Sequence, residues 1–193
     1  MGMTETLRER YPSIYKDAAG KSTLDYGISC GEGWFVLLDT LSALIVERAS
    51  ARNLTVQVLQ VKEKFGGLRF YLRGHDRYIS GLIGAAESLA YRHCEKCGKL
   101  GRLYAGGWRR ILCCEHVEAA NREALPIEGY DDEDEMGEDG LPDYDKAEAA
   151  GEMRFNTYDN EPADEAAERR EGFDRMIAAL QARTDPGTGA LRP

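Results

Sequence analysis

Apolar residues recur at three- and four-residue spacing in two stretches of this chain, and this spacing places each set on one face of an α-helix. In residues 33–51 the apolar positions are Trp34, Leu37, Leu38, Leu41, Leu44 and Ile45. In residues 76–93 they are Ile79, Leu82, Ile83, Ala86, Leu89 and Ala90, with Asp76 as a helix cap. The pattern predicts two amphipathic helices that share a core.

Residues 54–72 follow an alternating pattern instead and are rich in Val, Phe and Tyr, which predicts a β-hairpin. Gly66 and Gly67 tolerate the positive φ angles of a two-residue turn, and this turn sets Phe65 opposite Leu68 and Lys64 opposite Arg69. One face is then apolar except for Glu63, and consists of Leu59, Val61, Phe65, Leu68, Phe70 and Leu72. The opposite face, here called the cationic face, consists of Lys62, Lys64, Arg69, Tyr71 and Arg73, together with Gln60.

Two further elements are expected outside this region. Residues 24–30 alternate briefly and predict a short strand. After Asn160, a candidate helix cap, an apolar stripe predicts a C-terminal helix that ends before Asp185. The stripe consists of Phe173, Met176, Ile177 and Leu180.

The net charge of −9 is unevenly divided along the chain. Residues 1–122 carry 18 Lys and Arg against 13 Asp and Glu, a charge of +5, whereas residues 123–193 carry 7 against 21, a charge of −14. Ten of the eighteen residues 128–145 are acidic, so self-repulsion predicts an extended segment. We therefore expect a basic domain (1–122), an acidic linker (123–159) and a C-terminal helix and tail (160–193), with everything after about Leu125 separable from the core.

The chain has no apolar run long enough to span a membrane and no secretory signal at its start. We therefore expect a cytoplasmic protein that does not bind membranes, with its five cysteines reduced. The acidic segment is interpreted as a solvating linker, and the alternatives are a nucleic-acid mimic, a mask over the basic half, or an adaptor for a host protein.

Four residues have the spacing of a zinc knuckle. Cys94 and Cys97 are followed after fifteen residues by Cys113 and His116, in the pattern Cys-x2-Cys-x15-Cys-x2-His within residues 94–116. Four protein ligands make a closed site, which predicts a structural rather than a catalytic zinc ion (Zn2+). Cys114 could replace Cys113 as a ligand. With the helices and the hairpin, this motif favours an α+β fold, in which two amphipathic helices pack on a small antiparallel hairpin sheet beside a zinc knuckle and an acidic C-terminal extension.

Two binding functions compete for the basic half. The cationic face has enough converging charge for a phosphate-bearing small ligand such as a nucleotide. The knuckle loop adds candidate nucleic-acid contacts, which are Arg102, Trp108, Arg109 and Arg110. A charge of only +5 favours the small ligand over a nucleic acid.

An enzyme is disfavoured because the chain has only three histidines and one of them is the predicted ligand His116. His75 and Asp76 could form a base and its orienting partner, but a helix cap explains Asp76 without catalysis.

Four motifs occur together in this chain: Gly31-Glu32-Gly33-Trp34, the run VKEKFGGLRFYL (61–72), Cys94-x2-Cys97-Gly98, and Gly107-Trp108 before Cys113 and His116. This combination resembles a family of uncharacterised small proteins encoded by tailed phages and prophages. The resemblance covers residues 11–116 and implies a bacterial host cytoplasm and a zinc knuckle. In that setting the small ligand could be a host immune signal, and the protein a counter-defence factor.

Overall fold

The structure is a computed structural model that describes residues 2–17, 19–24, 27–104, 108–118 and 161–192. Its helices are α1 (Met3–Arg10), α2 (Pro12–Tyr15), the 3-10 helix η1 (Glu32–Trp34), α3 (Phe35–Arg52), α4 (Arg77–Ala90), α5 (Cys114–Glu118) and α7 (Ala163–Gln181). Its strands are β1 (Ile28–Ser29), β2 (Gln57–Lys64), β3 (Gly67–Arg73), β4 (Arg102–Tyr104) and β5 (Arg110–Leu112). The predicted acidic linker lies outside the described residues.

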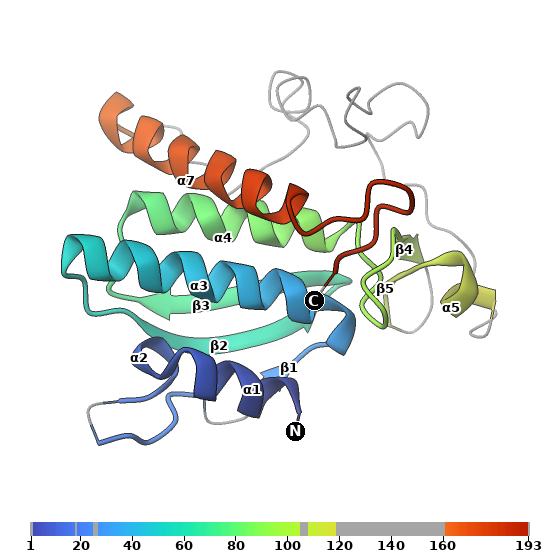
Figure 1. Cartoon of the computed structure of the whole chain (residues 1–193), viewed down its shortest axis with the longest axis horizontal. Helices are drawn as coiled ribbons and strands as arrows, with labels where there is room; N and C mark the ends of the chain where they lie inside the picture. The colour runs from blue at the N-terminus through green and yellow to red at the C-terminus, as the bar shows by residue number, and fades with distance from the viewer. Residues whose placement is uncertain (1, 18, 25–26, 105–107, 119–160, 193) are drawn as a thin grey trace.

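The fold is α+β, as predicted. Strand β2 is central in a three-stranded sheet and pairs antiparallel with β3 and parallel with the short β1. Figure 1 shows α3 and α4 lying along the sheet and α7 lying on α4. The inward side chains Val58, Val61, Leu68 and Phe70 form one core with these helices, because burying them removes apolar surface from water.

Both predicted amphipathic helices are present. Helix α3 is preceded by η1, and α4 begins after Asp76, whose carboxylate accepts a hydrogen bond of 3.0 Å from the Ile79 N–H. The second oxygen of Asp76 accepts from the Arg48 guanidinium at 2.7 Å. Asp76 is therefore a helix cap and an ion-pair partner, which accounts for both of its oxygens.

The turn of the β2–β3 hairpin is one residue earlier than predicted. Phe65 and Gly66 occupy it with φ angles of 56° and 87°, and Lys64 pairs with Gly67. Gly67 begins β3, and the Tyr91 hydroxyl lies where a Cβ at Gly67 would point, so only glycine fits at this position. The predicted pair Lys64 with Arg69 is thus wrong, and Arg69 lies opposite Lys62. The shift along β3 is two residues, an even number, so the paired side chains keep the faces predicted for them. The prediction that Phe65 belongs to the apolar face is wrong, because it lies in the turn and is 67% exposed.

A bulge between Val58 and Gln60 changes one further position. Val58 points into the core, whereas Leu59 is 44% exposed. The prediction that Leu59 belongs to the apolar face is wrong, because the bulge adds a residue and restarts the alternation.

The C-terminal helix is part of the core. Met176 and Leu180 of α7, and Leu191 after it, are buried with α3 and α4. The two helices cross closely, since a Cβ at Gly81 of α4 would overlap the Arg169 carbonyl oxygen and a Cβ at Gly172 of α7 would overlap that of Tyr78. The expectation that everything after about Leu125 is separable is therefore wrong for residues 163–192. The expected cap Asn160 lies outside the described residues.

The N-terminal helices, which the apolar pattern did not reveal, are tied to α3 and to the C-terminal tail through Asp39. Its buried carboxylate accepts hydrogen bonds from Arg10 and Tyr11, each at 2.9 Å, and from Arg183 at 3.0 Å. Segments from both ends of the described chain thus meet on one side chain of α3.

Candidate metal centre

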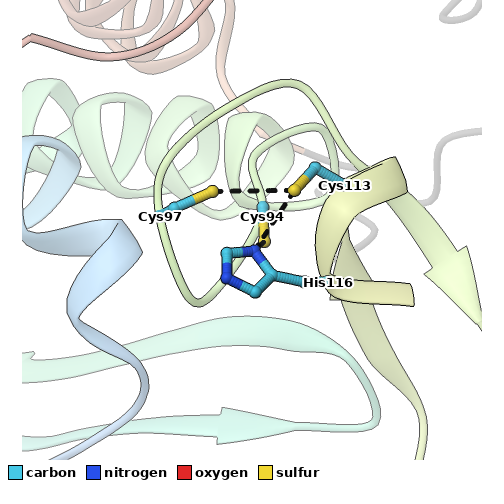
Figure 2. Close-up of side chains that lie close together, drawn as sticks. All are labelled: Cys94, Cys97, Cys113 and His116. Carbon is cyan, nitrogen blue, oxygen red and sulfur yellow. Dashed lines mark hydrogen bonds between the residues drawn. The ribbon is translucent and has the colours of Figure 1, made fainter. Parts of the chain in front are cut away.

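The first ligand pair lies in a tight knuckle just after α4. The Gly98 N–H donates to the Cys94 carbonyl oxygen at 2.9 Å, and the Cys94 N–H donates to that of Lys99 at 2.8 Å. Gly98 has a φ angle of 73°, a conformation that glycine adopts without strain. This turn brings Cys94 and Cys97 to the same side of the knuckle, as Figure 2 shows.

The second ligand pair lies where the β4–β5 hairpin passes into α5. Cys113 follows β5, and His116 lies in the first turn of α5, whose N–H groups at His116 and Val117 donate to the Cys113 carbonyl oxygen at 3.1 and 3.0 Å. Cys113 is buried within this cluster, whereas Cys114 is exposed. The geometry therefore selects Cys113 rather than Cys114 as the ligand.

The four ligand atoms lie within 4.8 Å of one another and form a group that can hold a metal ion. Figure 2 shows the four side chains pointing toward one another. The Cys97 and Cys113 sulfurs are 3.7 Å apart, and the His116 Nδ1 lies 3.2 Å from the Cys113 sulfur and 3.4 Å from the Cys94 sulfur. A tetrahedron with zinc–sulfur bonds of about 2.3 Å has sulfur–sulfur edges of about 3.8 Å, and sulfur–nitrogen edges of about 3.5 Å. The described cysteines form no disulfide, so their thiols are available as ligands.

The thiol groups of this cluster are perturbed by burial and by one another. Burial, together with the nearby sulfurs of Cys113 and Cys94, raises the pKa of Cys97 to about 12. Burial also raises the pKa of Cys113, but hydrogen bonds from the His116 N–H and from the neighbouring thiols outweigh it and leave this pKa below its ordinary value. A divalent cation favours the thiolate form of every cysteine ligand, because thiolates are the binding species.

The knuckle is fused to the start of α3. The Gly31 N–H donates to the Glu95 carboxylate at 3.0 Å, and the Gly33 N–H donates to the Glu95 carbonyl oxygen at 2.8 Å. A Cβ at Gly31 or at Gly33 would overlap the knuckle backbone, and the Trp34 indole donates to the His93 carbonyl oxygen at 2.7 Å. The Gly-Glu-Gly-Trp segment is therefore the surface on which the knuckle packs.

The C-terminal tail covers another side of the knuckle. The Leu191 N–H donates to the Gly98 carbonyl oxygen at 3.1 Å, and the buried Leu191 side chain joins the main core. The buried His93 ring contacts carbonyl oxygens of Leu89 and Gly189, which connects α4 to this tail. The first metal-ligating segment is thus held both by the segment before α3 and by the C-terminal tail.

The members of the cationic face share one face of the sheet, but they differ in their partners. Lys62 and Lys64 lie along β2, and the ring of Tyr71 lies 5.5 Å from the Lys62 ammonium group. The Arg69 guanidinium hydrogen-bonds with Tyr91 and lies 3.9 Å from the Glu87 carboxylate, and Arg73 donates to the Gln57 side chain. The two lysines and Tyr71 are therefore the members best placed to meet a ligand.

The candidate nucleic-acid contacts lie on the β4–β5 hairpin, beside the β2–β3 turn. The Trp108 indole donates to the Glu63 carboxylate at 2.5 Å, while its side chain stays 61% exposed. Arg102 and Arg109 are exposed. Arg110 instead lies 3.4 Å from the buried Glu95 carboxylate, so its charge is already partly compensated.

Three glutamates with structural roles were missed by the sequence analysis. Glu63 accepts from Trp108 and from the Gly66 N–H, Glu87 accepts from the Phe70 N–H, and Glu95 joins the knuckle to η1. Burial raises the pKa of both Glu87 and Glu95. The signal for Glu63 was its position as the lone acid on an apolar strand face, whereas Glu87 and Glu95 sit in sequences that carry no such signal.

His75 does not form a catalytic pair with Asp76 in this arrangement. Both oxygens of Asp76 are engaged by Ile79 and Arg48, and burial lowers the pKa of His75.

In the described part of the chain, no helix has the length and apolar character needed to cross a bilayer. A scan of protein-family models and searches of curated proteins and of solved structures each found no match to this chain.

Proposed function

We propose that the metal held by Cys94, Cys97, Cys113 and His116 is zinc, and that it is structural. Three thiolates and one imidazole in a tetrahedral arrangement form a donor set typical of zinc. All four coordination positions are filled by the protein, which leaves none for a reacting water. The ion would hold the knuckle, the β4–β5 hairpin and α5 together.

We infer further that the protein is a non-enzymatic binding protein for a phosphate-bearing ligand. The observation that carries this proposal is the outward face of the sheet. Its side chains that pair in register across β1, β2 and β3 are cationic, polar or aromatic, and none is acidic: Ser29, Gln57, Gln60, Lys62, Lys64, Arg69, Tyr71 and Arg73. A face with one sign of charge attracts phosphates, and charge-assisted hydrogen bonds hold them.

The lysines are the main phosphate contacts in this proposal. Lys64 is exposed at the end of β2, and Lys62 is two residues away on the same face. Arg69 and Arg73 keep their partners Glu87 and Gln57 and would extend the positive field without direct contact. In the phage setting implied by the family resemblance, a nucleotide signal of the bacterial host is one such ligand. A role of the acidic segment as an adaptor remains a separate proposal, since that segment lies outside the described residues.

The test is calorimetric titration of the zinc-loaded protein with a nucleoside triphosphate at low salt. We expect Lys64→Gln to weaken binding by about 1.5 to 3 kcal/mol, roughly ten- to more than a hundredfold, because one charge-assisted contact is lost. Lys21→Gln, in the loop after α2, is the matched control and should leave binding unchanged. Equal affinity in both variants, or no heat for any phosphate, would contradict the proposal.

A further inference from the structure

Two aromatic side chains are exposed beside the outward face of the sheet, and a third is exposed on the neighbouring β4–β5 hairpin. Tyr71 of β3 is 44% exposed, Phe65 of the β2–β3 turn is 67% exposed, and Trp108 before β5 is 61% exposed. Exposing so much aromatic surface forgoes the favourable burial that such side chains normally provide. Tyr71 and Phe65 lie next to lysines of the cationic face, whereas Trp108 bonds to Glu63, whose side chain belongs to the opposite, apolar face.

On this surface a lysine lies beside each of two rings, in the order Tyr71, Lys62, Lys64 and Phe65 along the hairpin. The Lys62 ammonium group lies 5.5 Å from the centre of the Tyr71 ring, and that of Lys64 lies 5.3 Å from the centre of the Phe65 ring. Phe65 directly follows Lys64 at the turn, and Tyr71 lies opposite Gln60, two residues before Lys62. Each ring therefore has a positive charge beside it.

The surface continues from the sheet to the β4–β5 hairpin. A Cβ at Gly66 would lie 3.7 Å from the Arg109 Cβ, so the turn and this hairpin are in contact. Figure 1 shows β4 and β5 at the end of the molecule where β2 turns into β3. The bond from the Trp108 indole to Glu63 connects the two hairpins at the same place and leaves most of the Trp108 side chain exposed.

We propose that this surface binds single-stranded nucleic acid, with bases stacked on Tyr71 and Phe65 and phosphates held by Lys62 and Lys64. The inference rests on the phosphate-binding function proposed above and names its ligand class. Exposed rings together with a line of cations form the stacking platform and charged track that hold an unpaired strand without sequence preference. The bases of a duplex are already stacked on one another, and a mononucleotide offers only one base to the rings.

The experiment measures the fluorescence anisotropy of a labelled oligothymidylate of about twenty nucleotides, longer than the site of one small binding module. Duplex DNA of the same length and thymidine triphosphate serve as competitors against the full-length, zinc-loaded protein. We expect the single strand to bind more tightly than either competitor. Tyr71→Leu and Phe65→Leu should each weaken it roughly five- to a hundredfold, because stacking on one ring is lost.

The control variant is Leu59→Ala, which removes an exposed side chain that has no ring. Its affinity should equal that of the unaltered protein, and melting curves of all variants should coincide. If Lys64→Gln weakens phosphate binding while both ring variants bind the strand unchanged, the stacking inference is wrong and the phosphate site stands. Duplex or triphosphate binding as tight as that of the single strand overturns the inference in the same way. If none of the three probes binds, the proposed function fails as well.

Discussion

Asp39 is the residue on which three distant segments converge. Burial alone would raise the pKa of its carboxyl, but hydrogen bonds from Arg10, Arg183 and Tyr11 outweigh this and lower it. The ionised form is therefore the one that stabilises the fold. That stabilisation is complete above the ordinary aspartate pKa of about 3.9, and is lost as the pH falls through the lower folded value.

The first prediction concerns Asp39→Asn. We expect a loss of about 1.5 to 3 kcal/mol in the free energy of unfolding near pH 7, because hydrogen bonds to a charged group are lost. The difference from the unaltered protein should shrink below about pH 4, where Asp39 itself becomes protonated. Denaturant unfolding at a series of pH values measures this, and a difference independent of pH would contradict it.

The second prediction separates two adjacent cysteines. Cys113→Ser should abolish stoichiometric metal binding and lower the melting temperature, because Cys113 is buried in the ligand cluster. Cys114→Ser should leave both unchanged, because its thiol is not among the four ligand atoms that lie together. Elemental analysis with thermal melting of the two purified variants checks the pair, and equal metal content in both would exclude Cys113 as a ligand.

At the scale of elements, the crossing of α4 and α7 depends on two glycines that let the helix backbones touch. Alanine favours a helix over glycine by about 1 kcal/mol, so Gly172→Ala would stabilise an isolated helix. In the folded chain its Cβ would overlap the Tyr78 carbonyl oxygen, which requires the helices to separate. The steric effect should dominate, because protein interiors are close-packed and tolerate little added volume.

The third prediction follows from that overlap. Gly172→Ala should destabilise the protein by about 1 to 3 kcal/mol, the usual effect of overpacking. Asp174→Ala is the matched control, because it adds helix propensity at an exposed position of the same helix. Urea unfolding of both variants measures the difference, and a stabilised Gly172→Ala would show that α7 does not press on α4.

At the scale of the whole molecule, residues 161–192 complete the core. Truncation before residue 161 would expose the face of α4 that α7 covers, remove the buried Met176 and Leu180, and take Arg183 from Asp39. We expect the shortened protein to aggregate or to melt without cooperativity. A soluble fragment with an unchanged melting temperature would show instead that the residues after about Leu125 can be removed without harm to the core.

The fifth prediction concerns the metal. Excess chelator should lower the melting temperature. It should also remove the protection against hydrogen exchange at the N–H groups of Gly31 and Gly33, because both donate to Glu95 between the ligands Cys94 and Cys97. Hydrogen exchange with and without chelator measures this. Unchanged protection at both groups would show that the knuckle keeps its shape without the ion.

The sequence by itself determined the features that depend on residues close together in the chain. Helical spacing located α3 and α4, and Asp76 was recognisable as a cap because its partner is three residues away. The Cys-x2-Cys and Cys-x2-His pairs identified the metal cluster, since ligand spacing within each pair is local. The face of each lysine on β2 followed from alternation alone.

Tertiary structure decided what depends on residues far apart. Phe65 and Gly66 form the turn, and Gly67 packs against Tyr91 from beyond α4, a contact that no pattern within the hairpin contains. The partners Glu87 and Glu95 reduce the availability of Arg69 and Arg110, and they come from α4 and the knuckle. Helix α7 packs closely on α4 because Gly172 leaves room for the Tyr78 carbonyl oxygen, and these two residues are far apart in the sequence. Packing of this kind depends on helix and strand surfaces that come into contact only after folding, so it cannot be predicted from the spacing of residues along the chain.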